Sequence, residues 1–331
     1  MNAIEVKNLN KEFTFSVKDE KKGFWNNLLN PKKKKVKAVH DINFSVKRGE
    51  RIAFIGPNGA GKSTTIKMLT GILFPSSGKI KVLGLNPQID RKKLAYKIGT
   101  VFGQRSQLFP NLPLTESMYF FGVMYDLENR EILKRIDELC KIFDLNDFAN
   151  QPVRKLSLGQ RMRAEVACAL IHKPEIIFLD EPTIGLDVVS KKSLRELLLK
   201  LNKEEGTTIF LTSHDVGDIE SLCERTVIVN NGEIVKDLPT TELTKTFVHE
   251  KYVDIFLQNK LSVLPELPDG ISYKNIEKAK GSEKIKLIID LKILNISESL
   301  KQILSLFEVI DIEVFDVDLE TVIREIYDNK Q

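Results

Sequence analysis

Alternating apolar positions near the start of the chain predict two β-strands, one within residues 3–15 and one within 36–46. A short apolar run follows at Arg51–Ile55 and leads into a glycine-rich turn that begins at Gly56. Residues 63–73 then space their apolar side chains as a helix does. Because a buried strand, a glycine loop and a helix follow one another in this order, the pattern predicts an α/β fold.

The middle of the chain has a different pattern. Residues from about 105 to 172 contain few β-branched runs and predict a helical subdomain. Short apolar runs return at residues 176–179, 208–212 and 226–229, and each predicts a buried strand. We therefore expect one domain over residues 1–235, an α/β core with an antiparallel β subdomain and an inserted helical subdomain.

From about residue 236 the composition changes again, and short elements alternate between strand and helix patterns. They are residues 252–257, 284–291, 297–306 and 309–315, with a final helix from Asp318. Strands followed by helices in so short a segment are typical of a small α+β unit. We expect residues 236–331 to form such an accessory domain.

The composition limits the classes of function. The chain has 331 residues and a formal net charge of +4, which is too small to favour nucleic acid as a partner. Its three cysteines lie far apart, without the spacing of a metal site. No stretch reaches the roughly 18 apolar residues that a transmembrane helix needs. If the chain works at a membrane, we expect it to do so from outside the bilayer.

Residues 18–37 form a basic insertion between the first two predicted strands. It contains the only tryptophan, Trp25, and a run of lysines at residues 32–35. A basic, partly apolar segment of this kind is typical of one that lies on the anionic inner face of a membrane. A loop surrounded by solvent explains the same pattern equally well. Both interpretations stay open.

The turn after the third predicted strand has the pattern G-x-x-x-x-G-K-[ST]. Glycines let backbone N–H groups turn toward a phosphate, the lysine neutralises phosphate oxygens, and the hydroxyl binds Mg²⁺. The helix that follows directs its positive end at the same anion. The residues that we expect to hold ATP here are Gly56, Asn58, Gly59, Ala60, Gly61, Lys62, Ser63 and Thr64.

The apolar run at 176–179 ends in two carboxylates, Asp180 and Glu181. A buried strand delivers Asp180 to its C-terminal end, where a carboxylate can hold Mg²⁺ through water, with Ser63 as another expected Mg²⁺ ligand. The adjacent Glu181 can polarise the attacking water as a general base. Strands that end in acids are common, but the phosphate loop upstream favours this chemistry.

The sequence LSLGQ at residues 156–160 opens a helix. Ser157 and Gly159 at a helix start make an end that can bind an anion. An ordinary helix N-cap explains an isolated LSLGQ at least as well.

Taken in this order, the segments resemble the nucleotide-binding subunits of ABC transporters. The resemblance implies that Gln104 in VFGQ is the Q-loop glutamine, a catalytic residue and Mg²⁺ ligand, and that His214 in LTSH is the catalytic switch histidine. It implies that Asp187 in IGLD belongs to the D-loop and contacts the nucleotide. Phe13 in KEF falls where the family stacks an aromatic side chain on adenine; Phe15 is a weaker candidate, and either could pack in a core.

The resemblance further implies that two copies enclose two ATP molecules between them. Lys62, Ser63, Asp180 and Glu181 of one copy would then face Ser157 and Gly159 of the other. Gln160 of the same signature is also expected to bind the nucleotide. Every catalytic position keeps the residue type of an active family member, so a homodimer with two working sites is expected.

A finer resemblance is to the ATPases of drug and viologen exporters, the ABC type-2 group. It rests on VFGQRSQL, LSLGQRMRAEVA and DEPTIGLDVVS, and on the insertion after the first strand. It implies an ATPase at the inner face of the cell membrane that powers export through a separate permease. The alternatives are a polysaccharide exporter, an importer with a β-barrel tail, and a soluble ATPase of repair or translation. The last usually has a coiled coil or two cassettes.

Overall fold

The structure, a computed structural model, describes most of the chain. The described residues are 1–17, 32–102, 106–213, 215–247, 250–257, 261, 263–279 and 282–316. They belong to two compact units, Met1–Thr240 and Thr241–Gln331. The sequence predicts the boundary slightly earlier, near residue 235, which lies within the last strand of the first unit.

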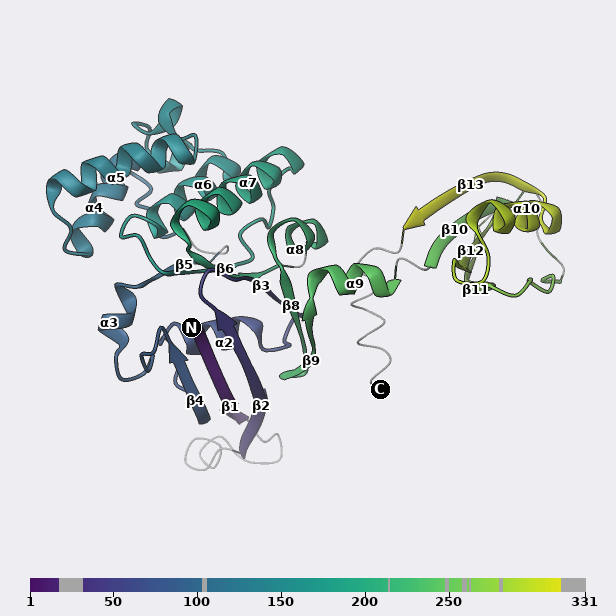
Figure 1. Ribbon diagram of the computed structural model, residues 1–331, viewed down its shortest axis with the longest axis horizontal. Helices are drawn as coiled ribbons and strands as arrows, with labels where there is room; N and C mark the ends of the chain where they lie inside the picture. The colour runs from purple at the N-terminus through teal and green to yellow at the C-terminus, as the bar shows by residue number, and fades with distance from the viewer. Residues whose placement is uncertain are drawn as a thin grey trace. The chain divides into compact units, whose positions relative to one another are not determined.

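A six-stranded sheet forms the centre of the first unit (Figure 1). Its order is β5-β6-β7-β3-β8-β9, and all neighbours are parallel except β8 and β9. The strands are β3 (Arg51–Ile55), β5 (Ile98–Phe102), β6 (Ile176–Asp180), β7 (Thr208–Thr212), β8 (Arg225–Asn230) and β9 (Glu233–Pro239). Because β3, β6 and β7 are parallel neighbours, their carboxyl ends meet at one edge, where the following loops can share a site.

A second, antiparallel sheet has the order β2-β1-β4. Its strands are β1 (Asn2–Val17), β2 (Lys32–Lys47) and β4 (Ser77–Val82). Helix α2 (Lys62–Leu69) packs with both sheets, since its Ile66, Met68 and Leu69 belong to one buried cluster with side chains of each. The main core of this unit therefore lies around α2.

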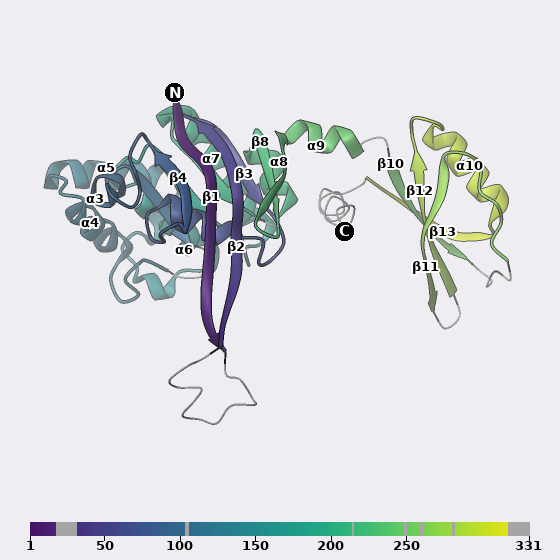
Figure 2. The same cartoon turned by 90° about the horizontal axis from the view of Figure 1, so that it is seen from below.

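β1 and β2 form a long ribbon that pairs as far as Val17 and Lys32 (Figure 2). β2 begins earlier than the sequence predicts, so the lysine-rich end of the predicted insertion lies in a strand. Lys35 Nζ there lies 3.9 Å from Glu12 Oε2 of the paired strand. Residues 18–31 of the insertion, with Trp25, lie outside the described residues.

Most of the remaining helices of the first unit lie on the opposite side of the central sheet from α2 (Figure 1). The remaining helices are α3 (Arg91–Ala95), α4 (Leu114–Met124), α5 (Asn129–Ile142), α6 (Leu158–Ala169), α7 (Val188–Glu205) and α8 (Val216–Leu222), with 3₁₀ turns at Asn146–Phe148 and Val153–Lys155. α4, α5 and α6 make up most of the helical subdomain that the sequence predicts.

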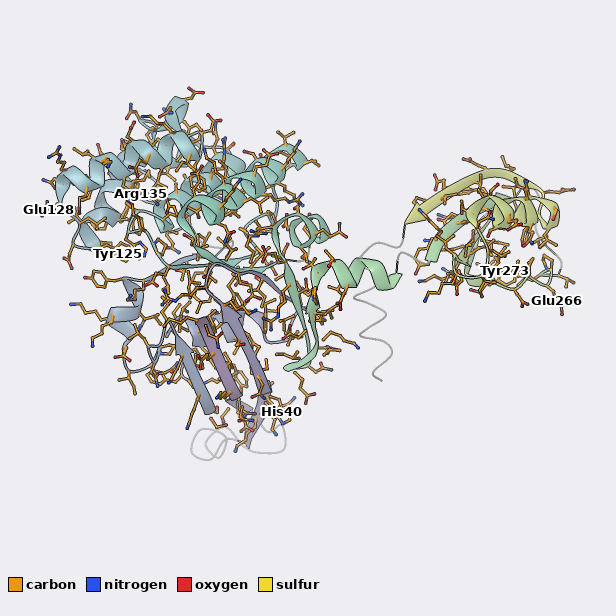
Figure 3. All side chains as sticks on the ribbon, viewed as in Figure 1. His40, Tyr125, Glu128, Arg135, Glu266 and Tyr273 are labelled. Atoms are coloured by element: carbon orange, nitrogen blue, oxygen red, sulfur yellow. The ribbon has the colours of Figure 1, made fainter. Side chains whose placement is uncertain are left out.

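Buried polar contacts fix the helical subdomain to its neighbours. Arg135 of α5, labelled in Figure 3, donates to both carboxylate oxygens of Glu205 on α7, at 2.6 and 2.9 Å, and to the carbonyl of Leu170. Within the subdomain, Tyr125 stacks on the ring of His172 with ring centroids 3.7 Å apart. Burial lowers the pKa of His172 to about 4, so this ring is neutral near pH 7.

The second unit has a four-stranded antiparallel sheet of order β11-β12-β10-β13. Its elements are α9 (Thr240–Phe247), β10 (Glu250–Leu257), β11 (Ile271–Ala279), β12 (Ser282–Asp290), α10 (Ile296–Leu306) and β13 (Val309–Asp316). Val253 and Ile255 of β10 form a buried cluster with Ile303 of α10. The predicted fold class, with its small α+β unit, is confirmed. The predicted helix from Asp318 lies outside the described residues.

Candidate nucleotide site

The predicted phosphate loop connects β3 to α2. Gly61 has a φ of 102°, and a Cβ there would lie 2.5 Å from the carbonyl oxygen of Ala38, so only glycine fits. Within the described residues, no side chain caps the first turn of α2. The positive end of the helix dipole therefore faces this loop without a capping side chain at the N-cap, as the anion-binding pattern requires.

Lys62 lies inside this loop and is only 6% exposed. Its Nζ donates to the carbonyl oxygens of Gly56 at 2.6 Å and Pro57 at 3.2 Å. Burial lowers the pKa of Lys62, while the nearby charges of Glu181 and Asp180 oppose that change. The ammonium group is thus held at the loop by carbonyl oxygens, which phosphate oxygens can replace.

Asp180 ends β6 beside the start of α2. The hydroxyl of Ser63 lies 3.4 Å from Asp180 Oδ1, and the hydroxyl of Thr212 donates to the same oxygen at 2.6 Å. A hydroxyl and a carboxylate this close are hard oxygen donors of the kind that Mg²⁺ binds. The described residues contain no group of three or more His, Cys, Asp or Glu side chains that could hold a metal. The pair therefore fits Mg²⁺ that is bound mainly through nucleotide phosphates and water, as is usual for this ion.

Glu181 has a left-handed backbone, with a φ of 56°. Such a conformation costs a residue other than glycine about 1–3 kcal/mol and persists only where its surroundings hold it. Here the N–H of Glu181 lies 3.0 Å from the carbonyl oxygen of Thr212 and 3.2 Å from the hydroxyl of the same residue. The end of β7 thus fixes the direction in which Glu181 leaves β6.

The loop and Glu181 surround a cavity of about 490 Å³. Its volume is within the usual range for small-molecule sites. The residues that line it are Ala38, Pro57, Asn58, Gly59, Ala60, Gly61, Lys62, Ser63, Thr64, Glu181 and Ile184. The structure therefore brings together nearly all of the predicted phosphate-loop residues and the predicted base; Gly56 takes part through its carbonyl contact with Lys62.

The predicted signature residues do not line this cavity. Ser157 caps α6 in a capping box: its hydroxyl accepts from the Gln160 N–H at 3.2 Å, and its own N–H donates to Gln160 Oε1 at 2.9 Å. A Cβ on Gly159 would lie 2.5 Å from the Ser190 hydroxyl oxygen of α7. In a single copy the N-cap interpretation thus describes Ser157, and this end of α6 packs against α7.

Asp187 likewise caps its own helix. Its carboxylate accepts from the backbone N–H of Ser190 at 2.9 Å and from the Ser190 hydroxyl at 2.7 Å. These hydrogen bonds lower the pKa of Asp187. Because Ser190 also contacts the position of Gly159, the predicted signature and D-loop residues lie side by side, apart from the lining of the cavity.

Of the remaining predicted site residues Phe13, Gln104 and His214, the structure describes only Phe13. Phe13 lies on β1, with its ring 6.2 Å from that of Phe15 and Lys11 Nζ 5.1 Å above it, and it does not line the cavity. Gln104 and His214 lie outside the described residues.

Sequence reasoning missed Thr212 and Ala38. Thr212 contacts both acids of the site, and Ala38 lines the cavity. The sequence holds only a partial signal for Thr212, because it ends a predicted strand. Its position opposite Asp180 follows from the β6–β7 register, which the structure shows. Ala38 follows the lysine-rich insertion and has no chemical signal of its own.

Comparison with known proteins identifies the family. Residues 39–184 match the ABC transporter family. The ATP-binding protein NatA of Bacillus subtilis is 37% identical over 204 residues, which cover 62% of this chain and 82% of NatA. The chain belongs to the ABC transporter family. Bacitracin transport ATP-binding protein BcrA of Bacillus licheniformis is 36% identical over 232 residues, 70% of this chain and 74% of that protein.

Solved structures agree with this assignment. CbiO1 of Clostridium perfringens, part of an ABC transporter complex, superposes with a TM-score of 0.62 at 31% identity, over 73% of this chain and 90% of its own. A dimeric ATP-binding cassette, MJ0796 with ADP and Pi, gives a TM-score of 0.60 at 28% identity, over 72% of this chain and 98% of its own. The chain is thus an ABC transporter ATP-binding subunit and an ATPase. Among its described helices, none is long and apolar enough to cross a membrane.

Proposed function

We propose that this subunit powers export through a separate permease at the inner face of the cell membrane. The observation that carries this is the reach of the similarity: it extends over 70% of the chain for the bacitracin transport protein BcrA. A linearmycin resistance protein of Bacillus subtilis is 39% identical over 62% of the chain. An energy-coupling factor ATPase of Methanococcus maripaludis is also 39% identical, but over 60%.

Hydrolysis would use the chain's own side chains in separate roles. Lys62 binds phosphate oxygens in place of the carbonyls that it now contacts. Ser63 and Asp180 would hold Mg²⁺, which neutralises the phosphate charge when it is bound. Glu181, beside Lys62 at the cavity, accepts the proton of the attacking water. The family resemblance assigns Gln104 a catalytic and Mg²⁺-binding role, and His214 the role of the catalytic switch histidine.

Two copies would complete each site. Ser157, Gly159, Gln160 and Asp187 do not line the cavity of their own copy, although the family resemblance assigns them to ATP. In a symmetric dimer the two subunits meet through the same surface, so these residues of each copy can reach the cavity of its partner. The accessory unit after Thr240 would add contacts to the second copy or to the permease.

The first test replaces the proposed base. Glu181→Gln should retain ATP binding, because Lys62 is unchanged, and should slow hydrolysis by about 10²–10⁴-fold, the usual contribution of a general base. Glu175→Gln is the control. Glu175 precedes the same strand, β6, and pairs with Lys97 at 2.6 Å, away from the cavity lining. Near-normal turnover by Glu181→Gln would reject the proposed role.

The second test concerns the permease. Full-length tagged protein, purified in mild detergent from membranes of its native host, should bring down a membrane protein with several spans. Inside-out vesicles that contain this complex should accumulate its substrate only with ATP outside. ATP-driven release of substrate from these vesicles would support the importer alternative. Absence of any membrane partner would reject both.

A further inference from the structure

A buried carboxylate behind the site joins two loops that the mechanism uses. Asp218 of α8 is only 1% exposed. It accepts hydrogen bonds from the hydroxyl of Thr183, from the hydroxyl of Ser213 at 2.8 Å, and from Arg195 Nε at 2.6 Å. Thr183 and Ser213 are themselves 5% and 2% exposed. A buried carboxylate with this many donors is strongly fixed, because each unmet contact would cost desolvation.

The two hydroxyls belong to the loops that follow β6 and β7. Thr183 stands two residues after Glu181. Ser213 directly follows Thr212, whose hydroxyl donates to Asp180 at 2.6 Å and whose carbonyl accepts from the Glu181 N–H at 3.0 Å. Asp218 therefore holds both loops at the point where each leaves its strand.

The same network reaches α7. Arg195, which donates to Asp218, also donates to Asp215 Oδ1 at 3.1 Å. Lys191, one turn earlier on α7, donates to Asp215 Oδ2. The helix that Asp187 caps is thus tied to the same loop. Two carboxylates and two cations form a compact charged cluster directly behind the β6 and β7 loops.

We propose that Asp218 is a positioning residue for ATP hydrolysis, which acts by holding the left-handed backbone of Glu181 in the direction of the cavity. This rests on the proposed role of Glu181 as the base. The unusual φ of 56° has to be imposed from outside. Thr212 imposes it on one side of Glu181, and Asp218 imposes it through Thr183 on the other.

The test is Asp218→Asn in the full-length protein, which keeps the size of the side chain but cannot accept all three donors. We expect kcat to fall about 10–100-fold, since small displacements of a catalytic group cost about this much. KM and the affinity for a fluorescent ATP analogue should change by less than about 2-fold, because the Lys62 loop does not contact Asp218. Asp237→Asn is the control; it breaks a two-bond pair with Arg225, at 2.6 Å for each bond, on the far edge strand.

The deciding measurement repeats the substitution in the Glu181→Gln background under single-turnover conditions. If Asp218 acts through Glu181, the additional loss should disappear, because groups that act as a unit are not additive. A loss of equal size in both backgrounds would overturn the proposal and indicate a general structural role. Thr183→Val, which removes one hydroxyl, gives the same comparison if Asp218→Asn does not fold.

The outcome is separable from that of the proposed function. Wild-type ATPase activity with normal turnover in Glu181→Gln would reject the base itself. Slow turnover in Glu181→Gln with wild-type kcat in both Asp218→Asn and Thr183→Val would reject only the positioning role.

Discussion

The N-termini of α2 and α6 both present the positive end of a helix dipole, but only α6 has an N-cap side chain that accepts a hydrogen bond from its first turn. α2 begins after Gly61, and within the described residues no side chain caps it. α6 begins after Ser157, whose hydroxyl and N–H both bond to Gln160. An anion that approaches α2 meets a helix start without a capping side chain at its N-cap, whereas at α6 it has to displace hydrogen bonds that the capping box already makes. The first end is suited to bind a phosphate alone, and the second is suited to join afterwards.

The surroundings of the two ends support the same distinction. The N-terminus of α2, which begins at Lys62, lines the cavity. The N-terminus of α6 lies against α7, where Gly159 is close to the side chain of Ser190. If nucleotide binding begins at α2 and a second copy brings α6, a single subunit should bind ATP well and hydrolyse it poorly. Three substitutions test this difference.

The largest effect is expected at α2. Lys62→Ala removes the one cation that contacts the phosphate loop in the described structure. We expect hydrolysis to fall by about 10²–10³-fold or more, the loss typical of a group that stabilises transition-state charge. ATP affinity, measured by equilibrium binding, should fall with it. Lys67→Ala is the matched control, because Lys67 is an exposed lysine of the same helix. Equal effects of both variants would contradict the distinction.

A mixing experiment tests whether the α6 end serves another copy. Ser157→Arg should inactivate a homodimer by blocking the N-terminus of α6. Lys62→Ala should inactivate one by removing the lysine that binds phosphate at the N-terminus of α2. An equal mixture forms hybrids in which one site has both ends intact. Hydrolysis should then recover to roughly a quarter of the wild-type rate if subunits pair at random in symmetric dimers. No recovery in verified hybrids would count against sites shared by two subunits, unless hydrolysis at the two sites is obligatorily coupled.

The local chemistry of both ends could be predicted from the sequence. Glycines, Lys62 and Ser63 are recognisable in order, and the strand that ends at Asp180 is a plain apolar run. The N-cap alternative for Ser157 was also visible, and the structure shows that cap. These predictions succeed because each depends on residues within one or two turns of each other.

Features that depend on distant strands could not be predicted. β2 begins at Lys32 because β1 pairs with it as far as Val17, although its lysines lack alternation. The positive φ of Glu181 is imposed by Thr212 of another strand. The contacts of Asp218 depend on how α8 packs behind β6 and β7. No local pattern carries that information.

The smallest expected effect separates the two roles of Ser157. Ser157→Ala removes the hydroxyl that accepts the Gln160 N–H and should lower the free energy of unfolding by about 0.5–2 kcal/mol, the usual cost of an N-cap. Asn295→Ala is the matched change in the second unit, where the Asn295 side chain accepts from the Glu298 N–H at 2.9 Å and caps α10. Chemical denaturation should show similar losses for the two caps.

Their effects on hydrolysis should differ. Loss of a hydrogen bond to a charged group costs about 1.5–3 kcal/mol, so Ser157→Ala should slow hydrolysis by about 10-fold or more at saturating ATP. ATP binding to a single copy should be unchanged, because Ser157 does not line its cavity. Asn295→Ala should leave both binding and hydrolysis at the wild-type level. If Ser157→Ala hydrolyses ATP as fast as Asn295→Ala, the hydroxyl is only a helix cap, and the α6 end contributes to the partner's site through its backbone alone.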